Sequence, residues 1–397
     1  MGKISAYFDS YRNPPGDRYV DVLDGIRVLC VLLVGWFHIW QQSWLSPTLV
    51  IGNQVISLDF LLRSGYIWVD GLLLVSGFLL YLPFTVGNKP PAILPFYKKR
   101  LIRIVPSYVL SMIPMFILAI VRGQYGSWQH AARDMAAHLT FTHTLFPFSY
   151  YGSPINGALW TLGVEMQFYF IFPFLARAFK KYPLVTWCAM TGVAFAFRGY
   201  AATLPDCAMH FNQLPAFLDV YANGFLAASV YAVLRKRLGK EKTDPRIRLF
   251  FTVVFILCVC QFVTIAKGQA ASGTQERIRL GQMERRFPLS VTLCCAMLSA
   301  AFSLPALRFF LGNPVMKFLS SISFQFYIYH QVFAVQLKSW GFPPSEYPSP
   351  WSAGDYPWQF SYTLCCFLGA LLIAFLVTYL FEIPIARRLR RGMDAKA

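Results

Sequence analysis

The first apolar segment of the chain carries an arginine and a histidine on one predicted helix face. Arg27 and His38 lie eleven positions apart, which is about three turns and roughly 16 Å along a helix axis. Their angular offset is only about 20°, and Asp24 and Gln42 fall within about 40° of His38. Ionisable groups are costly in hydrocarbon, so such a stripe is a functional candidate. A neutral imidazole suits a general base that takes a proton from a hydroxyl, and His38 is our candidate base.

A second group of charges precedes the third apolar segment. Arg100 and Arg103, within the run from Phe96 to Pro106, would share one side of a helix where it enters the membrane. Guanidinium groups bind phosphate oxygens in pairs, so these arginines could clamp a phosphate-bearing substrate. The alternative is that they only anchor the helix end at the membrane surface.

A third pattern surrounds a carboxylate. Thr161, Glu165 and Tyr169 recur every four residues on one helix face, whereas Trp160 and Gln167 lie on another. A carboxylate in apolar surroundings needs a partner. The arginine and histidine of the first helix are candidates for that contact, which the sequence alone does not establish.

Two further ionisable residues lie within apolar segments. Asp70 falls in the second segment, and we treat it as a supporting site residue. His330 falls in the ninth, after Tyr327 and Tyr329, and we interpret it as a structural histidine near the membrane interface.

These residues need membrane helices to position them. Charged residues make up 14% of the chain and hydrophobic residues 56%, with a mean hydropathy of +0.47, whereas soluble domains carry about a quarter charged residues. We predict an all-α, polytopic integral membrane protein with about ten transmembrane helices in one domain, residues 1–397. The predicted spans are Val22–Trp40, Ile67–Pro83, Ile102–Val121, Phe168–Phe179, Pro183–Phe197, Leu214–Leu234, Leu249–Ala266, Leu289–Phe302, Phe318–Val335 and Thr363–Phe381.

The formal net charge of +18 would suggest nucleic-acid binding in a soluble protein. Here the basic residues cluster beside membrane ends on one predicted side, which favours the positive-inside pattern and no nucleic-acid partner. We therefore predict a plasma (inner) membrane protein with both termini cytoplasmic, in short tails 1–20 and 386–397. The basic segments are Lys3 with Arg12 and Arg18, Lys98–Arg103, Lys180–Lys181, Arg235–Arg248 and Arg387–Arg391.

One basic segment, Lys267 to Arg286, falls on the predicted outer side, and we interpret it as amphipathic or substrate-facing. The longer outer links, Arg122–Asn156 and Lys338–Trp358, could line an opening and select a substrate. All cysteines except Cys207 lie in predicted spans, without zinc or disulfide spacing, so no metal site is expected. The N-terminus shows no cleavable signal peptide.

Six segments, taken in order, carry a combined pattern. They are Leu23 to Arg27 leading to His38, Trp68 to Phe78, Tyr97 to Pro106, Leu159 to Pro173, Ser323 to His330 and Phe381 to Pro384. Together they resemble the acyltransferase family 3 membrane proteins, which include bacterial polysaccharide O-acetyltransferases. The first segment matches the family's Arg-x10-His pattern, and the resemblance covers nearly the whole chain. Met166 departs from it, because many members carry a second glutamate there.

The resemblance implies transfer of an acyl group, with acetyl expected, from cytoplasmic acyl-CoA to a hydroxyl of a sugar or other acceptor. His38 would then be the base or a covalent acyl relay, and Arg27 its companion, which could stabilise the developing oxyanion. Arg100 and Arg103 would bind the donor's phosphates. No permanently bound cofactor is implied.

The remaining candidates have supporting roles in this scheme. Glu165 or Asp24 would orient the catalytic histidine, and Asp70 and Trp160 would support the site. Many family members add a C-terminal soluble esterase-like domain, and none is expected here.

Two alternatives stay open at this point. A transporter or flippase could use the same polar stripe as a substrate path, although paired interrupted half-helices are not evident. A structural or sensory membrane protein could use it as interior polar contacts. The sequence does not name the acceptor, the acyl chain length or the oligomeric state.

Overall fold

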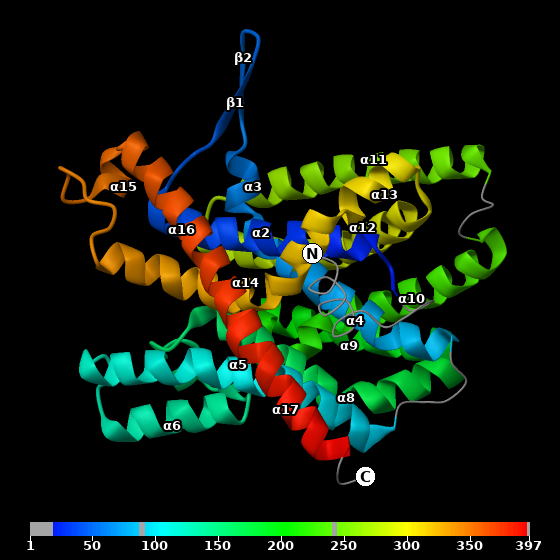
Figure 1. Ribbon diagram of the computed structural model, residues 1–397, viewed down its shortest axis with the longest axis horizontal. Coiled ribbons are helices and arrows are strands. Elements are labelled where there is room, and N and C mark those ends of the chain that lie inside the picture. The colour runs from blue at the N-terminus through cyan, green and yellow to red at the C-terminus, as the bar shows by residue number, and fades with distance from the viewer. Residues whose placement is uncertain (1–18, 87–91, 240–243, 395–397) are drawn as a thin grey trace.

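Long helices dominate the computed structural model, which describes residues 19–86, 92–239 and 244–394 (Figure 1). Each of the ten predicted apolar segments falls on one of them, in three cases with an adjoining short helical turn or π-helical stretch. The all-α prediction is therefore confirmed for the described residues. The long helices are α2 (Val22–Ser43), α4 (Val69–Val86), α5 (Ile93–Val121), α8 (Trp160–Lys181), α9 (Pro183–Ala202), α10 (Leu218–Leu238), α11 (Pro245–Ala270), α12 (Gln275–Phe302), α14 (Pro314–Ser339) and α16 (Tyr356–Leu376).

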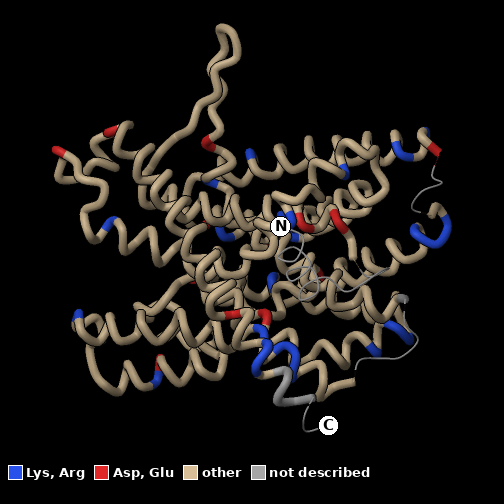
Figure 2. The backbone as a smooth tube through the Cα atoms, in the orientation of Figure 1, with Lys and Arg blue, Asp and Glu red and all other residues tan. Residues whose placement is uncertain are grey.

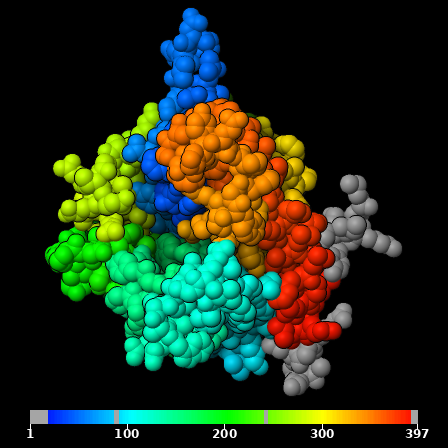
Figure 3. Space-filling model, turned by 90° about the vertical axis from the view of Figure 1, so that its left-hand side faces the viewer, coloured from blue at the N-terminus to red at the C-terminus, as the bar shows by residue number. Residues whose placement is uncertain are grey.

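Short elements connect or extend these helices. They are β1 (Thr48–Ile51), β2 (Gln54–Ser57), α3 (Asp59–Arg63), η1 (Gly65–Trp68), α6 (Trp128–Leu139), η2 (His143–Leu145), α7 (Pro147–Tyr150), η3 (Gly157–Leu159), η4 (His210–Asn212), η5 (Leu214–Phe217), α13 (Pro305–Gly312), α15 (Pro350–Ala353), the π-helical η6 (Val377–Glu382) and α17 (Ile383–Asp394). The two strands form an exposed antiparallel hairpin, with Thr48 opposite Ser57, which projects from the helical body (Figure 3).

Seven helical segments of the described chain are long and apolar enough to cross a membrane. The count rises to eight if the pair formed by Gln275–Phe302 and Pro305–Ser339, bent by 113°, is taken as one span. The protein is thus polytopic. Our count of ten spans is not confirmed, and it stays a prediction.

Lysines and arginines gather at the ends of α8, α10, α11 and α5, toward the right and bottom of the molecule in Figure 2. This grouping follows the predicted positive-inside pattern, while the assignment of that side to the cytoplasm stays a prediction. Lys3, Arg12 and Arg18 lie outside the described residues.

Helices α2 and α14 pack in parallel through the core. Along their length, Arg27 lies beside Ser320, Gly35 beside Phe326 and Gln42 beside Lys338. Gly35 permits this close approach, since an added Cβ would lie 2.6 Å from the Phe326 ring. Small residues allow such contact between membrane helices. At the far end, Lys338 donates to the Gln42 carbonyl across 2.9 Å. This pairing sets which α14 residues face the polar stripe of α2.

Candidate active site

His38 lies on α2 with part of its surface exposed. Its Nδ1 is 3.0 Å from Oε1 of Gln41, one turn further along the helix. Because an amide oxygen only accepts hydrogen bonds, this contact places the proton on Nδ1. Nε2 then carries the lone pair, and it can act as a base or as a nucleophile. The partner that orients the imidazole is therefore Gln41, a residue that the sequence analysis did not select.

His330 lies beside this group. The ring centroids of His38 and His330 are 5.2 Å apart, and His330 is fully buried. The interpretation of His330 as a histidine near the membrane interface overlooked this neighbour. Its motif gives no signal of the contact, which joins two helices far apart in the sequence.

Arg27 is held at a different level of the same helix pair. Its Nη1 lies 3.5 Å from Oγ of Ser320, on α14, ten residues before His330. Ten residues of helix correspond to about 15 Å. About 15 Å of helix thus separates Ser320, the contact of Arg27, from His330, the neighbour of His38. The oxyanion role expected for Arg27 stays a prediction.

Asp24 lies still further from His38. It accepts a hydrogen bond from the Tyr19 hydroxyl, and fourteen helix positions, about 21 Å, separate it from the histidine. The alignment of the stripe along one face was predictable, but the structure does not bring Asp24 to His38. Its expected role in orienting the imidazole is not supported by this geometry.

Glu165 is bound by two hydroxyl groups. Ser76 donates to its Oε1 across 2.8 Å, and the Tyr169 hydroxyl donates to the same oxygen. These partners replace the arginine and histidine that the sequence suggested as candidates. Ser76 lies within the Trp68–Phe78 segment, but the helix pattern did not indicate which residue it would meet.

Arg100 joins the same cluster. Its guanidinium lies over the rings of Phe96 and Tyr169, with its Cζ 5.4 Å and 5.3 Å from their centroids. It interacts electrostatically with Glu165, and its Nε is buried without a hydrogen-bond partner among the described residues. Arg103, one turn further on, is exposed. A rigidly stacked arginine next to an exposed one could hold phosphate oxygens.

Asp70 belongs to a buried charge network. Its Oδ2 accepts from Nε of Arg286 across 3.2 Å, and both side chains are inaccessible to solvent. A second buried pair, Arg198 with Asp219, is bidentate at 2.9 and 2.7 Å. Both arginines also donate to the Ala216 carbonyl, at 3.2 Å from Arg286 and 2.8 Å from Arg198. This arrangement gives Asp70 a structural role that holds helices together.

Trp160 is adjacent to this network. The ring of Trp160 stacks on the ring of Phe217, with their centroids 6.0 Å apart. The Cζ of Arg286 lies 3.8 Å from the centroid of the Phe217 ring. Arg286 ends the basic segment that the sequence placed on the outer side, and its burial means that it is not substrate-facing. Arg279 of the same segment pairs with Asp206 at 2.7 Å. Asp70 and Asp206 thus neutralise two arginines of the basic segment that falls on the predicted outer side.

The link between α5 and α8 contains a buried polar cluster. Burial by itself would raise the pKa of Asp134, but hydrogen bonds from His138, Ser149 and Tyr125 outweigh it and lower that pKa to about 2. Burial, aided by the nearby His138, lowers the pKa of His143 to about 3. The two imidazoles stack with centroids 4.3 Å apart. The link Arg122–Asn156 is thus held in place by hydrogen bonds within the link itself.

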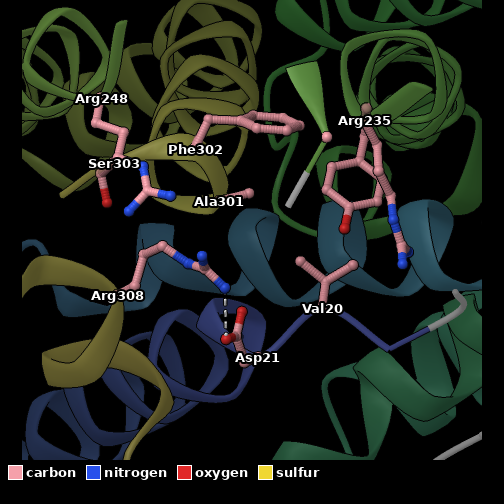
Figure 4. A pocket seen from close by; sticks show the side chains of 10 residues that line it. Val20, Asp21, Arg235, Arg248, Ala301, Phe302, Ser303 and Arg308 are labelled. Carbon is pink, nitrogen blue, oxygen red and sulfur yellow. Dashed lines mark hydrogen bonds and ion pairs between the residues drawn. The ribbon is translucent and has the colours of Figure 1, made fainter. Parts of the chain in front are cut away.

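A separate cleft opens between the ends of α10, α11, α12 and α13 (Figure 4). Arg235, Arg248 and Arg308 line it. Nη2 of Arg308 lies 3.0 Å from Oδ2 of Asp21. None of the predicted site residues lines this cleft, so we keep it apart from the candidate active site.

Comparison with known proteins identifies the family of the chain. The family model described as "Acyltransferase domain" matches residues 20–382, and the chain therefore belongs to acyltransferase family 3. Acyltransferase MdmB of Streptomyces mycarofaciens is 28% identical over 190 residues, 46% of each chain. Nodulation protein 10 of Rhizobium leguminosarum bv. viciae is 26% identical over 195 residues, 46% of this chain and 49% of the relative. The matches thus span about half the length of these curated relatives, and no solved structure matches the chain.

Proposed function

We propose that this chain is a membrane O-acyltransferase that moves an acyl group, with acetyl expected, from cytoplasmic acyl-CoA to a hydroxyl of a sugar or another small acceptor. The observation that carries the proposal is the state of His38, whose Nδ1 is engaged by Gln41 and whose Nε2 is left as base or nucleophile. The family match and the relative named as an acyltransferase support this choice of chemistry.

Donor binding is assigned to the Arg100 cluster. The two aromatic rings and Glu165 restrain the Arg100 guanidinium, so little side-chain freedom is lost when it contacts a phosphate. Exposed Arg103 adds a second positive charge one turn away. Arg27, held at Ser320, would contact the donor along its path toward the histidine.

At His38 the transfer can follow two routes. In direct transfer, Nε2 takes the proton of the acceptor hydroxyl, the oxygen forms a bond to the thioester carbon, and the carbon–sulfur bond breaks. In the relay route, Nε2 attacks the thioester first, and the acceptor then displaces the acyl group from the imidazole. In both routes the thiolate of coenzyme A finally receives the acceptor's proton.

The test is release of free coenzyme A from acetyl-CoA by purified protein in lipid nanodiscs, with and without a panel of sugar acceptors. We expect acceptor-stimulated release by wild type and at least a hundredfold loss in His38→Gln, as for removal of a general base. His210→Gln is the matched control, because His210 lies between α9 and α10 and outside the proposed site.

The outcome separates the two main functional classes. Equal release by wild type and His38→Gln would refute the assigned role of His38. Intact acetyl-, succinyl- and longer acyl-CoA in the presence of folded protein, together with substrate uptake into liposomes, would favour a transporter instead.

A further inference from the structure

His330 is a buried titratable residue that the mechanism above does not use. Its Nδ1 lies 3.1 Å from the Phe326 carbonyl oxygen and 2.8 Å from that of Tyr327. A carbonyl only accepts hydrogen bonds, so Nδ1 carries the proton and Nε2 carries the lone pair. Within the described chain this Nε2 is buried and has no hydrogen-bond partner. Buried polar atoms without a partner are rare and call for an explanation.

The unpartnered edge of His330 faces α2. A Cβ added to Gly35 would lie 3.7 Å from His330 Cδ2, the carbon bonded to Nε2. The ring stacks on Phe326 at 5.6 Å with an interplanar angle of 12°, which holds its orientation. The His38 ring centroid is 5.2 Å away. The negative end of a fixed imidazole dipole is therefore directed at the helix that carries His38.

Both routes of acyl transfer place a positive charge on His38. When Nε2 takes the acceptor's proton, the ring becomes an imidazolium. When Nε2 forms a bond to the acyl carbon as the carbon–sulfur bond breaks, the ring becomes an acyl-imidazolium. Gln41 already accepts from Nδ1 of the resting ring. Fixed dipoles aimed at developing charge in a poorly solvated site contribute strongly to catalysis.

We propose that His330 is a positioning residue whose Nε2 lone pair stabilises the positive charge that His38 acquires during acyl transfer. The inference rests on the proposed function, and it adds a second imidazole to that site. Because the charge is absent from the resting protein, removal of the lone pair lowers the rate of turnover and leaves substrate binding nearly unchanged.

The test compares His330→Phe, which keeps a planar ring without an acceptor, with His330→Gln, whose Oε1 can take the place of Nε2. The assay is steady-state coenzyme A release from acetyl-CoA by purified protein in nanodiscs. We expect kcat of His330→Phe to fall about 10- to 100-fold, with KM for acetyl-CoA within about twofold of wild type. His330→Gln should stay within about fivefold of wild type. Tyr329→Phe, the preceding residue on α14, is the control for a ring substitution in this helix.

The pair of variants distinguishes charge stabilisation from packing. Wild-type kcat in His330→Phe would overturn the inference. Equal losses in the Phe and Gln variants, accompanied by a higher KM or a lower unfolding temperature, would also overturn it and assign His330 a packing role. Wild-type protein without His38-dependent release would refute the proposed function itself, and the inference with it.

Discussion

The buried pair of Asp70 and Arg286 gives a prediction that does not depend on the enzymatic assignment. Replacing Arg286 with leucine leaves the Asp70 carboxylate buried, with its Oδ1 already unpartnered among the described residues. Removing one member of a buried ion pair costs about 3–5 kcal/mol. Asp70→Asn should destabilise the protein less, by about 1–3 kcal/mol, because Arg286 retains its hydrogen bonds to the carbonyls of Phe211 and Ala216. The double variant removes both charges, and it should be more stable than the sum of the single effects predicts.

The measurement is reversible unfolding in mixed detergent micelles, followed by tryptophan fluorescence. Arg279→Leu is the matched control, because it breaks the pair with Asp206 at the surface and should cost less than about 1 kcal/mol. Equal destabilisation by Arg286→Leu and Arg279→Leu, or strict additivity in the double variant, would refute the assignment of a buried charge network.

Three further predictions concern other parts of the molecule. Gly35→Val should destabilise the protein by at least about 1–3 kcal/mol and reduce activity, because the new side chain would clash with the Phe326 ring. A fully active and equally stable variant would contradict the close packing of α2 on α14. Arg100→Gln should raise KM for acetyl-CoA roughly tenfold or more with a smaller change in kcat, whereas an unchanged KM would remove this residue from the donor site. Hydrogen bonds hold the pKa of Asp134 at about 2, below its ordinary value of 3.8, so its contribution to stability is present above about pH 4 and is lost as pH falls toward 2. Unfolding temperatures of wild type and Asp134→Asn should therefore converge as the pH is lowered over that range, and a constant difference would contradict the carboxylate's role.

The helices and the polar stripe could be read from the sequence because both depend on local pattern. Hydropathy along the chain located the apolar runs, and helix periodicity placed Arg27 and His38 on one face. The rise of the helix also gives their axial separation, about 16 Å, so the two residues lie at different levels of the same face.

The partners across helices could not be read in this way. Ser76 and Glu165 are 89 positions apart, and Asp70 and Arg286 are 216 apart. Helix periodicity states which face a residue occupies but not which helix covers that face. Arg286 shows the consequence. It ends a basic segment that the sequence indicates to be amphipathic or substrate-facing, whereas its guanidinium is buried and donates to the carbonyls of Phe211 and Ala216.

The central claim is tested most directly by the mass of an acceptor after incubation with acetyl-CoA and protein in nanodiscs. Wild type should add one acetyl mass to a sugar acceptor while coenzyme A is released in equal amount, and His38→Gln of equal thermal stability should form at least a hundredfold less product. Equal product from both proteins, or unmodified acceptors across a broad panel with intact acetyl-CoA, would contradict the account.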